Sequence, residues 1–163
     1  MKRLLIVLAC GLLAGCDYTV PLVTNPEMEI DRSLLGLWQT PKEDGKTEQL
    51  LVLPLDKNEY LVSYPSGAKD AMFARACLCR AAGKALVQLK WFGTAAAELP
   101  DDNKVFQFLT YSLKGDTLTV RLLNTEVVKN DVASTKALAE SIAQHKDDPG
   151  LFKEGAVFTK VKK

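Results

Sequence analysis

Cysteines are the residues of this chain whose spacing comes closest to a chemical site. The chain has four cysteines, and two of them stand in the tripeptide Cys77-Leu78-Cys79. On a strand, positions i and i+2 share a face with Cα atoms about 6.5–7 Å apart, which is the limit of disulfide reach. Buried free thiols are favoured, because cysteine is a common core residue. The alternatives are a strained disulfide that is easily reduced, or ligands of a metal ion.

The rest of the sequence offers little support for catalysis or for a metal centre. It contains no Gly-x-Ser-x-Gly, His-Glu-x-x-His, Cys-x-x-Cys or glycine-rich phosphate motif. The single histidine, His145, falls on the apolar stripe of an expected helix, where packing is the simpler role. The acidic pairs Asp101-Asp102 and Asp147-Asp148 lack the further ligands of a calcium loop. We therefore expect no enzyme, no cofactor and no metal.

Residues 1–15 have the pattern of a secretory signal peptide. Two cations precede the apolar run Leu4 to Leu13, and small residues follow it. The run is shorter than the roughly 20 residues that a membrane-spanning helix needs. The sequence Leu13-Ala14-Gly15-Cys16 that ends this segment is similar to the lipobox of bacterial lipoproteins.

The lipobox resemblance implies that the chain is cleaved before Cys16, that the Cys16 thiol is lipidated and that the new amino terminus is acylated. A protein with two or more acyl chains is stably anchored, whereas one chain holds it only marginally. The expected location is the cell envelope, with the protein anchored to the inner or the outer membrane and facing the periplasm. In enterobacterial lipoproteins an aspartate after the cysteine, here Asp17, tends to retain the protein at the inner membrane.

The charge balance argues against nucleic acid as a partner. The chain has 21 Lys and Arg residues, of which Lys2 and Arg3 lie in the leader, and 20 Asp and Glu residues. The processed chain is therefore almost neutral, without the basic excess typical of nucleic-acid-binding proteins. Residues 16–32 contain two prolines and no clear periodicity. They are interpreted as a lipidated N-terminus and a tether, or alternatively as an extra strand in which Val20, Leu22 and Val23 pack on the domain.

Residues 33–163 are expected to form one mainly β domain of eight short strands and one helix. Alternating apolar residues and the turn cluster Lys114-Gly115-Asp116 indicate consecutive hairpins. A period of 3.6 over residues 132–146, with Leu138 and Ile142 on one face and Ser134 or Thr135 as cap, indicates the helix. The expected strands are 35–40, 49–55, 59–64, 71–79, 84–92, 104–113, 117–123 and 156–161. Residues 94–103 are expected to form a loop.

An open sheet of this size would expose two edges, and closing it into a barrel removes both. The last strand, after the helix, is the natural partner of the first. Gly36-Leu37-Trp38 is similar to the Gly-x-Trp motif on the first strand of lipocalins. This resemblance implies a lipocalin-like (calycin-like) barrel in which Trp38 closes the floor beneath Lys160 or Arg121. The simpler role of Trp38 is that of a core side chain.

No motif in the sequence identifies a biochemical activity. Two functions are compatible with such a barrel. A barrel filled with side chains would act as an interaction or structural module that contacts another envelope protein. A barrel with internal space would bind a small apolar ligand. Small residues around one hairpin favour some space: Ala71, Ala74, Ala76, Ala81, Ala82 and Ala85. The filled barrel is the preferred interpretation.

Overall fold

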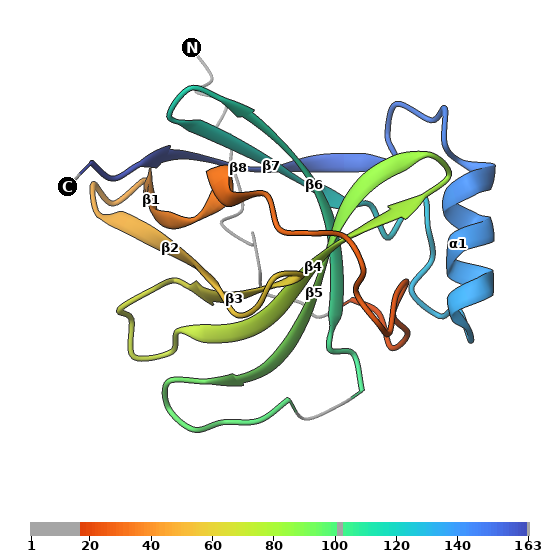
Figure 1. Ribbon diagram of the computed structural model, residues 1–163, viewed down its shortest axis with the longest axis horizontal. Coiled ribbons are helices and arrows are strands. Elements are labelled where there is room, and N and C mark those ends of the chain that lie inside the picture. The colour runs from red at the N-terminus through yellow and green to blue at the C-terminus, as the bar shows by residue number, and fades with distance from the viewer. Residues whose placement is uncertain (1–16, 101–102, 163) are drawn as a thin grey trace, which may run out of the picture.

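Consecutive hairpins carry the chain around one antiparallel sheet whose eight strands close into a barrel (Figure 1). The computed structural model describes residues 17–100 and 103–162. The expectations for residues 1–16 and for Asp101-Asp102 lie outside the described residues. The strands are β1 (Gly36–Pro41), β2 (Thr47–Pro54), β3 (Glu59–Tyr64), β4 (Met72–Ala81), β5 (Lys84–Thr94), β6 (Phe106–Lys114), β7 (Thr117–Leu123) and β8 (Phe152–Lys160). The helices are η1 (Arg32–Leu34), a 3-10 turn, and α1 (Thr135–Gln144).

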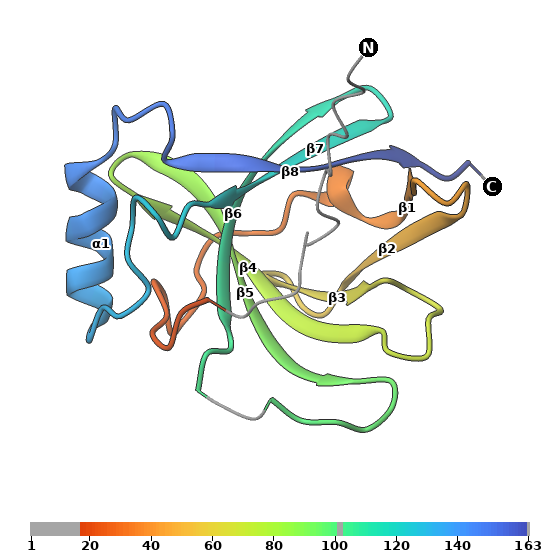
Figure 2. The ribbon, with the colours of Figure 1, turned by 180° about the vertical axis from the view of Figure 1, so that it is seen from behind.

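Pairing of β1 with β8 closes the barrel, as predicted. Trp38 lies opposite Lys160 and Gln39 opposite Thr159, and Val161 N–H donates to the Leu37 carbonyl at 2.9 Å. Figure 2 shows β8 crossing to reach β1 near the C-terminus of the chain. The closed sheet has no free edge along this seam, which removes the hazard of unpaired backbone groups.

The predicted strands agree with the observed ones to within two residues at each end, except at β8, which begins at Phe152 rather than Ala156. Gly155 interrupts the apolar alternation there. A Cβ at this position would lie 2.4 Å from the Val120 carbonyl oxygen, and the pairing of β7 with β8 shifts register beside it. Glycine is therefore needed at this position because the two backbones approach closely. Since it has no side chain, the period-2 alternation by which a strand is predicted is broken here.

Helix α1 forms where the 3.6 period predicts it and lies before the last strand. The Ser134 hydroxyl accepts a hydrogen bond from Ala137 N–H at 3.1 Å, which caps the first turn. Leu138 and Ile142 are fully buried. The helix packs against the outside of the barrel (Figures 1 and 2). His145, at its C-terminal end, contacts the Ser141 carbonyl through Nδ1 at 2.8 Å.

Two hydrophobic cores lie on opposite faces of the same sheet. The inner core fills the barrel and includes Trp38, Leu89, Trp91 and Phe158. The outer core lies between the sheet and α1; among its members are Cys79, Leu86, Phe108, Leu138 and Ile142. Because strand residues alternate between the two faces, several strands are apolar on both sides.

The segment expected to be a tether lies against the barrel instead. Tyr18 is fully buried in the outer core and forms an isolated β-bridge with Phe106. Farther along, Ile30 N–H donates to the Lys57 carbonyl at 3.0 Å. We call residues 17–31 the strap, because they begin on the outer core, reach the inner core at Met28 and Ile30 and lead into η1. Val20, Leu22 and Val23 pack on the outer core, so the packed alternative is the better description, although no further strand forms.

Candidate functional site

The interior of the barrel contains a small, partly open apolar cavity of about 90 Å³. Its lining is almost wholly aliphatic and aromatic and includes Leu89, Trp91, Leu109 and Ala76. Ligand pockets usually measure about 300–1,000 Å³. Side chains therefore fill most of the interior, and the remaining space suits only a molecule of a few heavy atoms.

Trp91 carries a polar group that the described residues leave unsatisfied. The residue is 1% exposed, it lines the cavity, and its indole Nε1–H has no hydrogen-bond partner. Buried indole N–H groups normally find an acceptor. A water molecule needs two to four polar partners to be held in a buried site, and this cavity is otherwise apolar.

Trp38 and Lys160 lie opposite each other on the β1–β8 pair that closes the barrel. The Trp38 indole Nε1–H donates to the Leu34 carbonyl at 2.8 Å, which ties β1 to η1. Of the two cations expected over this ring, Lys160 is the one present, with Nζ 4.9 Å from the ring centroid. Lys160 Nζ also donates to the Ser33 carbonyl at 3.1 Å.

Asp31 holds η1 over the barrel through two tyrosines that line the cavity. Its backbone N–H donates to the Tyr60 hydroxyl oxygen at 2.5 Å, and the Tyr111 hydroxyl donates to its carboxylate at 3.0 Å. Hydrogen bonds from Ser33 are the main reason that the pKa of Asp31 lies below its usual range. Burial, followed by the contact with Asp31, raises the pKa of Tyr111. The tyrosine therefore stays protonated and serves as a donor.

A larger hollow of about 530 Å³ lies outside the barrel, between the strap and the sheet. We call it the strap cleft. Its lining combines polar, charged and apolar side chains: Pro21, Val23, Thr24, Asn25, Pro26, Glu59, Arg75, Ala76, Cys77, Gln88, Lys90 and Phe106. Arg75 pairs with Glu59 through two hydrogen bonds, and Lys90 Nζ lies 5.8 Å from the centre of the Phe106 ring. The volume falls within the range of ligand pockets.

Gln88 attaches the strap to the floor of this cleft. Its Oε1 accepts from Leu22 N–H at 2.7 Å and from Val23 N–H at 3.1 Å, and its Nε2 donates to the Val23 carbonyl at 2.8 Å. The side chain is 7% exposed. A buried amide with this set of partners binds the strap backbone as a neighbouring strand would.

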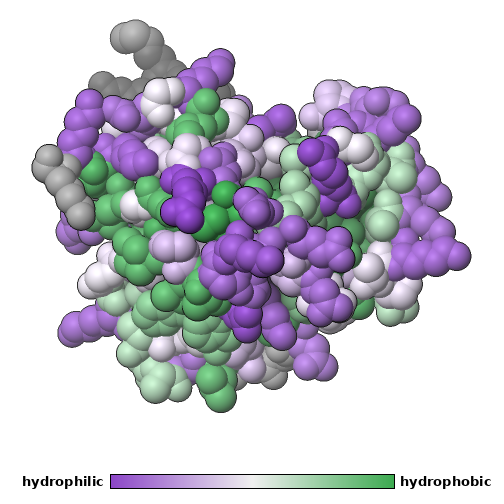
Figure 3. Space-filling view, viewed as in Figure 1, coloured by the Kyte–Doolittle hydropathy of each residue, from purple (hydrophilic) through white to green (hydrophobic). Residues whose placement is uncertain are grey.

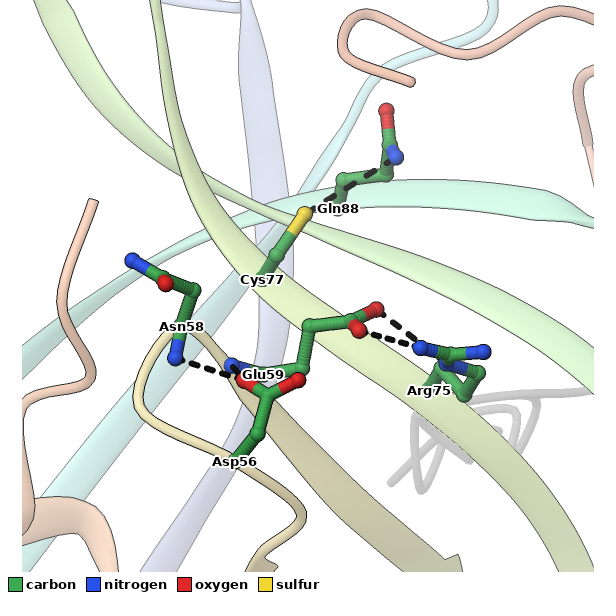
Figure 4. A network of polar contacts seen from close by, with 6 residues as sticks. All are labelled: Asp56, Asn58, Glu59, Arg75, Cys77 and Gln88. Carbon is green, nitrogen blue, oxygen red and sulfur yellow. Dashed lines mark hydrogen bonds and ion pairs between the residues drawn. The ribbon is translucent and has the colours of Figure 1, made fainter. Parts of the chain in front are cut away.

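Cys77 and Cys79 are placed as buried free thiols on the outer face of β4. Figure 4 shows Cys77 pointing toward Gln88, whose Nε2 lies 3.8 Å from the sulfur, with Glu59 and Arg75 nearby. Burial raises the pKa of Cys77 to about 11 and that of Cys79 to about 12. Both thiols are therefore protonated at neutral pH, which makes them poor nucleophiles and poor metal ligands.

The structure brings together few of the residues that the sequence singles out. Cys77 joins the strap cleft, but His145 lies at the end of α1, and the described residues contain no cluster of metal-ligating side chains. Gln88, Asp31 and Trp91 were missed. Their importance comes from partners distant in sequence, and a lone Gln, Asp or Trp gives no local signal.

Exposed apolar side chains are a further surface feature. Phe73 and Phe92 stack at the end of the β4–β5 pair with ring centroids 6.4 Å apart, and Leu99 is 75% exposed. Figure 3 shows hydrophobic residues over the side of the barrel formed by β2 to β5, whereas the outer edge around α1 is more hydrophilic. None of the described helices is long and apolar enough to cross a membrane.

Fold and cavities together define a closed, largely filled antiparallel barrel of eight strands with one helix before the last strand. Comparison with protein-family models, with curated proteins and with solved structures finds no match to this chain.

Proposed function

We propose that this chain is a bacterial envelope lipoprotein, anchored through lipid on Cys16, whose filled barrel acts as an interaction module. The difference in volume between the internal cavity and the strap cleft supports the role of interaction module. About 90 Å³ remains inside the barrel, whereas the strap cleft outside it measures about 530 Å³. The outer face of the barrel therefore offers more room for a binding partner than the interior does. The lipobox resemblance at Leu13-Ala14-Gly15-Cys16 supports the anchor.

The anchor is tested by Cys16→Ala, with Cys10→Ala as the matched control because Cys10 lies within the leader. Cys16→Ala should abolish lipid labelling and processing, whereas Cys10→Ala should be processed normally. Mass spectrometry of the amino terminus and labelling with a fatty-acid analogue provide the measurements. Normal lipid labelling of Cys16→Ala would refute the anchor.

The interaction module is tested by photocrosslinking in cells with a reactive residue at Asn25, in the strap cleft, or at Lys114, in the β6–β7 turn. A discrete adduct from Asn25 alone supports a partner at the cleft. Equal adducts at both positions, or none, count against it. Identification of the adduct by mass spectrometry then shows whether the partner is a protein.

A second candidate, the binding of a small apolar molecule, is favoured by the unpaired Trp91 Nε1–H beside the internal cavity. Native mass spectrometry of the delipidated protein would reveal a co-purified molecule. Titration with small ketones should move the Trp91 indole N–H resonance, whereas a hydrocarbon of equal size should move it less. A Trp91 resonance that responds to neither probe would exclude this candidate.

A further inference from the structure

The first residues of the strap are bound tightly to the barrel where the described chain begins. Asp17 N–H and Tyr18 N–H both donate to the Phe106 carbonyl, at 3.1 and 3.0 Å, and Phe106 N–H donates to the Tyr18 carbonyl at 3.0 Å. The Tyr18 hydroxyl donates to the buried Val128 carbonyl at 2.7 Å. The beginning of the strap is therefore fixed to β6 by both main-chain and side-chain contacts.

Cys16 is the next residue toward the amino terminus, and consecutive Cα atoms are about 3.8 Å apart. If Cys16 carries the lipid, as the proposed function requires, the acyl chains begin within one residue of the barrel. A tether of residues 17–32 could have reached about 50–60 Å if it were fully extended. The observed strap removes that reach, so a lipid on Cys16 would begin directly beside Asp17.

Two lysines belong to the strands at this exit point. Lys104 precedes by two residues the Phe106 that pairs with Tyr18, Lys153 is the second residue of β8, and both are exposed. Both act electrostatically on the Asp17 carboxylate, although burial outweighs them and raises the pKa of Asp17. Basic side chains near an anionic membrane are attracted to it, and the attraction falls off within a Debye length.

We propose that the surface formed by Asp17, Lys104 and Lys153, here called the anchor face, lies against phospholipid headgroups. The lipid on Cys16 then fixes the orientation of the barrel in addition to retaining it. The two lysines meet headgroup phosphates, and the opposite end of β6, at Lys114, points away from the bilayer. A β6 strand of this length separates the two ends by roughly 25 Å.

The test uses the lipidated full-length protein in vesicles of phosphatidylethanolamine and phosphatidylglycerol that contain a nitroxide headgroup lipid. A fluorophore is attached to Asn103→Cys, beside Lys104, or to Lys114→Cys as the matched control on the same strand. The buried, protonated Cys77 and Cys79 thiols should not compete for the label. We expect several-fold stronger quenching at position 103 than at position 114.

Two further variants separate lipid contact from other causes. The double variant Lys104→Glu/Lys153→Glu should reduce quenching at position 103 several-fold in anionic vesicles while the protein still floats with them. A flexible Gly-Ser linker inserted between Cys16 and Asp17 should reduce the difference between the two labels, because it restores the slack that the strap removes.

The outcomes separate the anchor from the orientation. A protein that does not float with the vesicles fails at the proposed lipidation. One that floats but shows equal quenching at positions 103 and 114, or none at 103, overturns the anchor face and leaves the lipid anchor intact. The latter result would also fit an anchor face that is occupied by a protein or by a second copy of the chain.

Discussion

Asp31 shows how one side chain can position an element and respond to pH. It caps η1 by accepting from Ser33 N–H at 2.9 Å and also accepts from the Tyr111 hydroxyl. Asp31→Ala should lower the free energy of unfolding by about 1–2 kcal/mol, through the lost cap and the lost, partly buried hydrogen bond from Tyr111. Urea denaturation followed by tryptophan fluorescence measures this change. An unchanged midpoint would mean that the Asp31 carboxylate is dispensable and that η1 is held by Trp38, Lys160 and the main-chain contact with Tyr60.

The same carboxylate should contribute to the acid sensitivity of the fold. The pKa of Asp31 is lower in the folded protein than in the unfolded chain. Its stabilising contribution is therefore complete above the unfolded value near pH 4 and is lost as the pH falls through the folded value. Asp31→Asn should flatten the loss of stability below pH 4. Tyr111→Phe removes only one of the hydrogen bonds and should reproduce part of that effect.

The state of the paired cysteines can be decided by thiol titration. In the chain from Asp17 onward, Cys77 and Cys79 are buried, and their raised pKa values leave on the order of 0.1% thiolate or less at pH 8. Ellman's reagent should therefore react slowly with the folded protein and rapidly with both thiols in urea. A chain that shows no thiol even in urea without reductant would contain the alternative disulfide.

Residue roles were predictable where a local motif carried them. Trp38 follows from Gly36-Leu37-Trp38, and its cation was expected to be Lys160 or Arg121. Gln88 was not predictable because its partners at positions 22 and 23 are main-chain groups. Main-chain partners leave no pattern in the side chains of the segment that is bound. Asp31 was missed for a related reason, since Tyr60 and Tyr111 reach it from other strands.

Among the elements, β8 depends on a glycine for its position. In Gly155→Ala the new Cβ would lie 2.4 Å from the Val120 carbonyl oxygen and 3.1 Å from its carbon. Because backbone atoms cannot move aside as a flexible side chain would, we expect a loss of about 2–4 kcal/mol in unfolding free energy. Val157→Ala, on the same strand and 54% exposed, is the control and should change stability by less than about 1 kcal/mol. Equal stabilities would mean that β7 and β8 separate easily there.

The strap should detach locally when its central attachment is removed. Gln88→Leu leaves the Leu22 and Val23 N–H groups and the Val23 carbonyl without their partner. Amide exchange at these two residues should accelerate strongly, and stability should fall by about 1–3 kcal/mol. Thr135→Ala, which removes one exposed hydrogen bond to the Pro21 carbonyl, should have a smaller effect. Equal amide exchange at Leu22 and Val23 in both variants would mean that the contacts of Tyr18, and not those of Gln88, hold this part of the strap on the barrel.

The sequence pattern predicted the elements well because most of them bury one face. Period-2 alternation and turn residues located all eight strands, and the 3.6 period with Ser134 located α1. The strap was expected first as a tether, with packing of Val20, Leu22 and Val23 only as the alternative, because its two prolines break any regular period. The early start of β8 was missed because Gly155 carries no side chain to show the alternation.

At the scale of the whole molecule, closure was predictable and the location of the hollows was not. An open sheet would expose two unpaired edges, and the last strand follows the helix. Both observations implied that β8 would pair with β1. The cavity volumes depend on how side chains interlock, and no one-dimensional pattern records that. The alanines show this limit: Ala74 and Ala76 face the inner core, whereas Ala81 belongs to the outer core beneath α1.

The barrel seam provides the most direct test of the whole architecture. Gln39 and Thr159 lie directly opposite on β1 and β8, and both are exposed. In Gln39→Cys/Thr159→Cys a disulfide should form on oxidation and raise the unfolding free energy by about 2–4 kcal/mol. Thr117 lies opposite Thr159 on β7, so Gln39→Cys/Thr117→Cys places the thiols two strands apart, about 10 Å, beyond bridging distance. Thiol titration and urea denaturation of both variants measure the outcome. Bridging of the control pair but not of the seam pair would show that β8 does not close on β1.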